Sequence, residues 1–367
     1  MIQQTYWIIS GRDVVRQYVK RCLVCFRHRA KACNQKMSDL PAARVIPTRP
    51  FQRCGVDFAG PFTLRRTIGG RSNQTCKSYV CVFVCFVTRA IHLELVSDLT
   101  SDSFMASFKR FIARRGLCSD IYSDCGTNFV GADTEIKRIY EFVQSADSGQ
   151  RIQQFLSARS VKWHFNPPSS PHFGGLWESG VRVVKGHLRR VIGTTSLNFE
   201  EYATLLAQVE SCVNSRPLAP LSCNPEDLSA LTPGHFLIGA PLNALPEHDL
   251  TDIKLNRLSR WQHCQQLAQH FWRRWHNEYL HQLQQRHKWN SVSENLAVGT
   301  MVLMKDERLS PTEWKLGRIL HTHPGPDGLV RVVTVKTSGG ELKRPIVKLC
   351  PLPFDQPSSA SSSSSFE

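Results

Sequence analysis

Three acidic side chains occur in sequence contexts that favour chemistry over simple solvation. Asp57 lies within the apolar run PFQRCGVDFAGPF, Asp124 lies before a glycine turn in IYSDCGTNF, and Glu178 follows the glycine pair of FGGLWESG. A carboxylate inside an apolar strand is costly, and three carboxylates brought together repel one another unless a cation neutralises them. Oxygen-only ligands suit Mg²⁺ or Mn²⁺, and two such ions about 3.5–4 Å apart act on the attacking and leaving oxygens in phosphoryl transfer. We therefore expect a divalent-metal site, although each residue taken singly could be an ordinary strand-end or helix-surface acid.

The segments around these acids predict an α/β domain. A strand containing Asp57 is expected to end at Gly60 and Pro61. Further strands are expected at 77–87, 90–96, 119–123 and 161–165, and helices at 101–115, 134–159, 176–192 and 199–215. The first of these helices has a Ser-x-Ser start and stops at Gly116. The stretch 166–175 is dense in turn residues, which predicts a mobile loop containing His172 as a polar loop residue.

Length and charge indicate several domains and a polyanionic partner. A chain of 367 residues exceeds the size of a single hydrophobic core. The net charge is +16, and the excess lies at 1–50, with 10 basic and 2 acidic residues, and at 251–350, with 16 and 8. Such flanks predict binding to nucleic acid. No apolar run approaches the roughly 20 residues that span a bilayer, so we expect no membrane contact. Thirteen cysteines without a signal peptide predict reduced thiols in a nuclear or cytoplasmic protein.

The C-terminal third predicts a long helix followed by short strands. Residues 256–289 carry an aromatic stripe from Trp261 to Tyr279, which could be a core or helix-pairing surface or a base-stacking platform. Beyond residue 290, strands separated by Gly, Pro and Asp turns predict a small β-barrel. Its basic side chains could contact DNA phosphates or could be an ordinary solvated surface; the candidates are Lys315, Arg318, Arg331, Lys336, Lys343 and Arg344. The last residues are Ser-rich, which predicts a disordered tail.

Taken together, the motifs PFQRCGVDFAGP, SDCGTNFVGA and NPPSSPHFGGLWESGVRVVK resemble the DDE retroviral-type integrase core, most closely the integrase region of Bel/Pao-type LTR retrotransposon polyproteins. The resemblance covers nearly the whole chain. It implies a ribonuclease H-like fold with a mixed five-stranded sheet and flanking helices, on which Asp57, Asp124 and Glu178 hold two Mg²⁺ or Mn²⁺ ions. It further implies 3′-end processing of cDNA and strand transfer into double-stranded target DNA by a homo-oligomer. The spacing between the second and third acids is longer than is usual in this family, which indicates an insertion within 131–160.

Basic residues follow Glu178 along the same predicted helix. Glu178, Arg182 and Lys185 fall at i, i+4 and i+7, so they share one helical face, and Arg189 follows one turn later. The face could be solvated, with an i,i+4 salt bridge from the acid to Arg182. The resemblance instead implies that these bases hold DNA-end phosphates.

Near the N-terminus, Cys22 and Cys25 have the spacing of half a zinc site, although a lone pair of this kind is also a common coincidence. The resemblance identifies this stretch as the second half of an N-terminal zinc-binding domain whose two histidines lie upstream. His28 follows the cysteines and cannot replace that pair. We therefore expect an incomplete, metal-free module and a chain that is a fragment or a decayed copy of the polyprotein.

The resemblance divides the chain into four parts. They are a partial zinc-binding module at 1–45, a catalytic core at 47–240, a helical linker with an SH3-like β-barrel at 250–353 and the tail at 354–367. Two other functions stay open beside the integrase. One is a ribonuclease H-like nuclease without strand transfer, and the other is a catalytically silent DNA-binding or host-adopted remnant.

Overall fold

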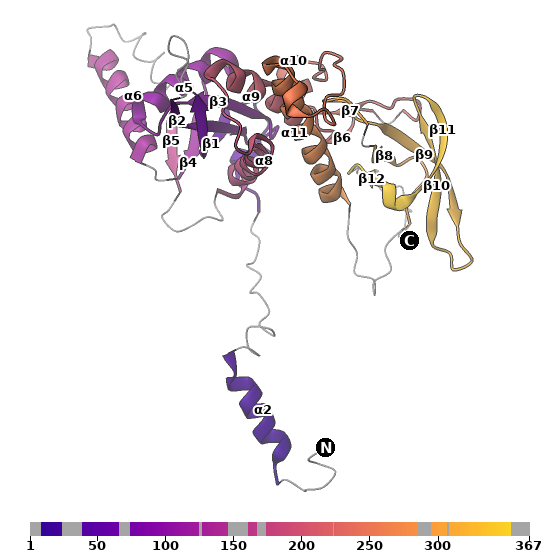
Figure 1. Cartoon of the computed structure of the whole chain (residues 1–367). Coiled ribbons are helices and arrows are strands. Elements are labelled where there is room, and N and C mark those ends of the chain that lie inside the picture. The colour runs from indigo at the N-terminus through magenta and orange to yellow at the C-terminus, as the bar shows by residue number, and fades with distance from the viewer. Residues whose placement is uncertain are drawn as a thin grey trace, which may run out of the picture. The chain divides into compact units, whose positions relative to one another are not determined.

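The computed structural model of the chain (Figure 1) describes residues 9–23, 39–65, 74–124, 127–145, 161–166, 174–222, 224–284, 295–306 and 308–353. The chain divides into two compact units, Met1–Ala42 and Ala43–Glu367. The first unit contains helix α2 (Gly11–Arg21), and the short helix α4 (Ala42–Val45) begins the second. Across the described ranges, no helix combines the length and the apolar character that crossing a bilayer requires.

The second unit begins with a mixed five-stranded sheet in the order β3-β2-β1-β4-β5. Its strands are β1 (Arg53–Arg65), β2 (Thr75–Cys85), β3 (Ile91–Val96), β4 (Asp120–Ser123) and β5 (Lys162–Phe165). Strand β2 pairs antiparallel with β1 and β3, whereas β4 lies parallel to β1 and β5. The flanking helices are α5 (Ser101–Arg115), α6 (Thr127–Ser145), α8 (Gly175–Ile192) and α9 (Phe199–Asn214) (Figure 1). The sequence prediction of an α/β core with a mixed five-stranded sheet and flanking helices is confirmed.

Helices cover both faces of this sheet, which explains why β2 is apolar at every position from Tyr79 to Cys85 instead of at alternate ones. Val82 and Val84 belong to the core cluster shared with α8 and α9. Phe83 and Cys85 point the other way, into the cluster shared with α5 and α6. Phe83 stacks on Phe111 of α5 with ring centroids 4.1 Å apart. The period of two along one strand therefore builds two separate hydrophobic layers.

Several element bounds match the sequence prediction and others differ for local reasons. Helix α5 has the predicted bounds, but its N-cap is Thr100, whose Oγ1 accepts from the Ser103 N–H at 3.2 Å. Helix α6 begins earlier than predicted because Phe129 packs on Phe58, with ring centroids 5.2 Å apart. Residues 146–160 of the predicted helix and insertion lie outside the described residues. Strand β1 does not end at Pro61; it continues after a shift of register.

The free edge of β3 is closed by side chains of α9. Asn214 accepts from the Ile91 N–H at 2.9 Å and donates to the Ile91 carbonyl at 2.7 Å. Glu210 accepts from the Leu93 N–H at 2.9 Å. These bonds replace a neighbouring strand, so this edge offers no ladder for another chain.

The C-terminal part holds a second sheet of five antiparallel strands in the order β11-β10-β9-β8-β12. The strands are β8 (Met301–Met304), β9 (Leu316–Pro324), β10 (Val330–Thr337), β11 (Gly340–Pro345) and β12 (Leu349–Pro351), with a 3₁₀ turn η3 (Ile346–Lys348) before β12. In the described residues, β11 and β12 are the two ends of the sheet and do not pair, so the predicted closed barrel is not confirmed. The remaining short elements are β6 (Ala219–Pro220), β7 (Ala230–Leu231), α10 (Pro233–Ile238) and the 3₁₀ turn η2 (Leu255–Arg257).

Helix α11 (Arg260–Leu283) packs between the two sheets and uses its aromatic stripe for that purpose. Its start is fixed by Ser259, which forms a capping box with Gln262. Trp272 and Trp275 are buried, and each makes an edge contact with Trp314 of the segment before β9. Trp272 and Trp275 are therefore core, in agreement with one of the two sequence interpretations, whereas Trp261 at the start of the stripe is 58% exposed.

Candidate active site

Asp57 lies in the central strand β1, on the face covered by α8. Its Oδ1 accepts from the N–H of Phe58 at 2.6 Å. Burial raises the pKa of Asp57 from 3.8 to about 6; the Phe58 hydrogen bond and Lys185 oppose this rise, and Asp124 and Glu178 add to it. The three predicted acids and one predicted base therefore lie within electrostatic range of one another.

Asp124 follows the last residue of β4, the parallel neighbour of β1. The register pairs Arg53 with Asp120 and Gly55 with Tyr122. Continuing that register by two residues places Asp124 beside Asp57. Its side chain is exposed, at the end of the strand. Parallel pairing thus explains how two acids far apart in sequence meet at one sheet position.

Glu178 lies in the first turn of α8, and a glycine on the neighbouring strand sets its position. A Cβ atom at Gly55 would collide with the indole of Trp177, so the absence of a side chain there lets α8 approach β1 closely. The carboxylate of Glu178 lies back against Gly174, where a Cβ atom would overlap its Oε1. Glu178 is exposed, on the face of the sheet that carries Asp57.

The donor set consists of carboxylate oxygens, which is what Mg²⁺ and Mn²⁺ prefer. The half-buried Asp57 carboxylate lies near two further acids, so a cation bound at the site would be stabilised. Among the described residues, however, no three His, Cys, Asp or Glu side chains are close enough together to hold a metal ion. The structure brings the acids within electrostatic range without assembling them into a formed ligand set.

The three predicted bases of α8 have different surroundings. Lys185 is half-buried and is the base that acts on Asp57. Arg189 is exposed, and its Nη2 donates to the Gly60 carbonyl of β1 at 2.9 Å. Arg182 is exposed and lines a separate hollow between α8 and α11. In the described part of the chain, Glu178 forms no ion pair with Arg182, so the predicted i,i+4 salt bridge is not present.

Arg318 does not have the surroundings of a DNA contact, which corrects the sequence prediction. It is only 5% exposed. Its guanidinium donates to the carbonyl oxygens of Gly299 at 3.0 Å, Asn224 at 3.1 Å and Asp227 at 3.0 Å. A guanidinium held this way ties the second sheet to the 224–227 turn and is unavailable to a phosphate. Sequence alone gave no reason to separate it from its exposed neighbours.

Three of the other predicted C-terminal bases line one hollow of about 600 Å³, whereas Arg331 pairs with Asp327 and Lys336 pairs with Glu226. Lys315, Lys343 and Arg344 line it, together with three bases that the sequence prediction missed, namely Lys305, Arg308 and Lys348. Asp306 is the acid among the lining residues, and it pairs with Lys315 at 3.0 Å. Lys305 directly follows β8, Lys348 ends η3 just before β12, and Arg308 lies in a loop. Only the pairing of β8 with β12 brings these bases together.

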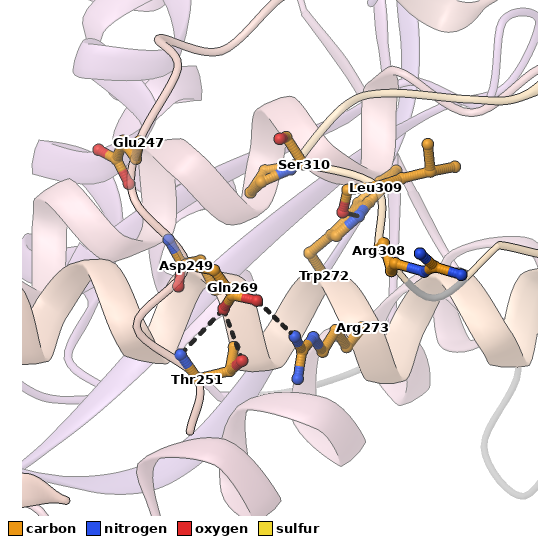
Figure 2. Close-up of a pocket in the computed structure, with 10 residues that line it drawn as sticks. Glu247, Asp249, Thr251, Gln269, Trp272, Arg273, Arg308, Leu309 and Ser310 are labelled. Carbon is orange, nitrogen blue, oxygen red and sulfur yellow. Dashed lines mark hydrogen bonds and ion pairs between the residues drawn. The ribbon is translucent and has the colours of Figure 1, made fainter. Parts of the chain in front are cut away.

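Figure 2 shows a much smaller hollow, of about 50 Å³, beside α11. Asp249 accepts from the N–H and hydroxyl of Thr251 at 3.0 and 2.6 Å and from Arg273 at 2.8 Å. Trp272 donates to the Leu309 carbonyl at 3.0 Å. These polar groups bind one another and thereby attach two connecting segments to α11. The residues around this hollow therefore have a structural role.

The N-terminal zinc prediction is left without a structural test. Cys22 is the C-cap residue of α2 and is half-buried. Cys25 and His28 lie outside the described residues, as do His172 and the predicted Ser-rich tail. The half-site therefore stays a prediction.

Residues 259–352 match the model of a family of unknown function, DUF5641. No curated protein matches the chain. Among solved structures, a simian T-cell lymphotropic virus intasome in complex with PP2A regulatory subunit B56 gamma is 12% identical over 94% of this chain and 92% of that one, with a TM-score of 0.35. The HTLV-2 integrase catalytic core domain with magnesium is similar in its dimeric form, at 15% identity over 45% of this chain and 88% of that one, with a TM-score of 0.28. Its trimeric form is similar at 16% identity over 52% and 97%, with a TM-score of 0.30. With TM-scores this low, the function of the chain rests on its own residues.

Proposed function

We propose that this chain is an integrase of the Bel/Pao retrotransposon type, a metal-dependent polynucleotidyl transferase. It uses water to trim the 3′ ends of cDNA and then uses the exposed 3′-hydroxyl to attack a phosphodiester of double-stranded target DNA. The observation that carries the proposal is the convergence of three acids: Asp57 is half-buried in β1, burial raises its pKa to about 6, and Asp124 and Glu178 lie close enough to add to that rise. A structural acid in a core is normally paired with a base, whereas acids gathered against one another are typical of a metal-dependent site.

Asp57, Asp124 and Glu178 are the residues that would hold two Mg²⁺ or Mn²⁺ ions. When bound, such ions would supply activation of the attacking oxygen and stabilisation of charge on the leaving oxygen, so the chemistry would require no Ser, Tyr or Cys nucleophile. The protein holds these carboxylates in position. Strand β1 fixes Asp57, and the contact of Trp177 with Gly55 fixes the helix that carries Glu178.

Basic side chains beside the acids and on the second sheet support binding to DNA. Lys185 and Arg189 follow Glu178 along α8 and can donate hydrogen bonds to the phosphates next to the reacting end. The six bases around the C-terminal hollow can hold a second stretch of phosphate backbone, with an affinity that falls steeply with salt. We assign residues 47–240 to the catalytic core and 250–353 to an integrase-associated module with an SH3-like sheet. We expect the active form to be a homo-oligomer.

Joining of a short duplex into a supercoiled plasmid in Mg²⁺ or Mn²⁺ tests the proposal. Asp124→Asn is the control, because the amide keeps the shape of the side chain and removes its charge. Joining by the parent and not by the variant supports an integrase. Cleavage without joining would replace the proposal with a ribonuclease H-like nuclease, and salt-sensitive DNA binding without either reaction would replace it with a silent DNA-binding protein.

A further inference from the structure

A hollow of about 530 Å³ lies beside the candidate active site, on the side of α8 that faces α11. It is lined by the turn between β2 and β3, by α8, by the residues after α9 and by α11. Its polar lining includes Arg89, Arg182 and Arg216 and one carboxylate, Glu278. A hollow of this volume is in the range of small-ligand sites.

The positive charge of this hollow is not neutralised by the protein. None of the three arginines forms an ion pair with a carboxylate within the described residues. Glu278 is the one carboxylate in the lining against three arginines, and it lies 3.1 Å from the Nε2 of His187, whose pKa is lowered by burial. The pKa of Arg216 is lowered from 12.5 to about 10, mainly by burial and to a smaller extent by the like charge of Arg89.

The arrangement is also fixed by backbone contacts. Arg216 donates through Nη1 to the Val213 carbonyl and through Nη2 to the Arg89 carbonyl, both at 2.7 Å. Arg89 has φ 56, a left-handed conformation that is rare and strained for a side chain of this kind. Strain and unneutralised charge are two separate costs at one place, and a bound anion would offset the second.

We propose that this hollow binds a phosphate-bearing ligand, with Arg89, Arg182 and Arg216 around the phosphate oxygens. The Arg216 guanidinium keeps Nε–H and one hydrogen on each Nη for the ligand, because each Nη uses one hydrogen on a carbonyl. Trp275 and Tyr279 stack on each other with ring centroids 5.6 Å apart and form an apolar wall for the organic part of the ligand. The site is distinct from the three acids, and the proposal does not depend on strand transfer.

Calorimetric titration of the full chain with inorganic pyrophosphate tests the site, using the variants Arg89→Gln and Arg257→Gln. Arg257 is an exposed arginine outside the hollow, so both variants lose one positive charge and only one loses it at the site. Losing a charge-assisted hydrogen bond predicts affinity about tenfold weaker for Arg89→Gln and unchanged for Arg257→Gln. Binding by Arg89→Gln equal to the parent, or no binding by the parent, would overturn the proposal.

A purely structural role for Arg89 gives a different result in the absence of ligand. Arg89 forms no ion pair in the described residues, and its charge opposes those of Arg44 and Arg216, so Arg89→Gln should unfold at the same or a higher temperature than the parent at low salt. A lower unfolding temperature would mean that Arg89 stabilises the fold and would contradict the assignment. Titration with a 5′-phosphorylated dinucleotide identifies the source of the phosphate. Tighter binding than pyrophosphate, with the same dependence on Arg89, indicates a nucleic-acid strand, and weaker binding indicates a free phosphate compound.

Discussion

Replacing Asp57 by Asn should stabilise the metal-free protein while abolishing DNA joining. In the folded chain the carboxylate is half-buried near Asp124 and Glu178, and partial burial and these two acids raise its pKa. Asn has nearly the same shape and carries no charge. The substitution therefore removes a repulsion from the fold and a ligand from the proposed metal site.

The size and pH dependence of this effect follow from the raised pKa. The pKa rises from 3.8 to about 6, and folding therefore favours the protonated form. The penalty of ionisation is absent below the unfolded pKa, grows as pH rises toward 6 and is complete above it. At about 1.4 kcal/mol per unit, the penalty at pH 7 is at most roughly 3 kcal/mol. Asp57→Asn should gain up to that amount at pH 7 and almost nothing at pH 4.

Denaturant unfolding of parent and variant at the two pH values, with and without Mg²⁺, measures the effect. Asp252→Asn is the matched control, because Asp252 is exposed and makes no ion pair within the described chain. Saturating Mg²⁺ at 100 times its Kd should stabilise the parent by about 2.7 kcal/mol and leave Asp57→Asn unchanged. A variant less stable than the parent at pH 7, or equally stabilised by Mg²⁺, would refute the reasoning.

Four further substitutions test the surrounding structure. Gly55→Ala should cost about 1–3 kcal/mol, because its Cβ meets the indole packed on it, and should also lower joining; unchanged joining would contradict this. His92 lies between the carboxylates of Glu94 and Glu210. Burial lowers its pKa, but the bonds to these two acids outweigh burial and raise it above 6.5. The stability that His92 contributes should therefore be lost as the pH rises through this raised pKa. His92→Gln should lose about 3–5 kcal/mol near pH 6 and flatten this dependence; an unaltered pH profile would count against it. Arg318→Met should destabilise the second sheet and leave the salt dependence of DNA binding unchanged. Lys343→Gln should reduce the slope of log affinity against log salt concentration by about one without unfolding the protein. The opposite pattern would make Arg318 the DNA contact and Lys343 the structural residue.

Much of the core fold could be predicted because its strands and helices carry local signals. The apolar run of β2 and the spaced phenylalanines of α5 fix those elements without tertiary information. The start of α6 could not be predicted, since it depends on Phe129 meeting Phe58 across the core. The continuation of β1 past Pro61 also depends on its partner strand, which accommodates the shift of register.

The candidate site shows the same division between local and long-range information. The unusual neighbours of Asp57, Asp124 and Glu178 pointed to these acids, and parallel pairing of β4 with β1 is what brings two of them together. Arg318 was assigned to the surface because basic residues in a strand are usually exposed. Its burial arises from carbonyl groups up to 94 positions away, which no local pattern reveals.

The most direct test of the central claim is Mn²⁺ binding, followed by electron paramagnetic resonance, in the parent and in Asp57→Asn, Asp124→Asn and Glu178→Gln. If the three carboxylates form one metal site, the parent binds Mn²⁺ and each single variant loses that binding while keeping its fold. Binding that survives in all three variants, or a folded parent that binds no Mn²⁺, would contradict the account.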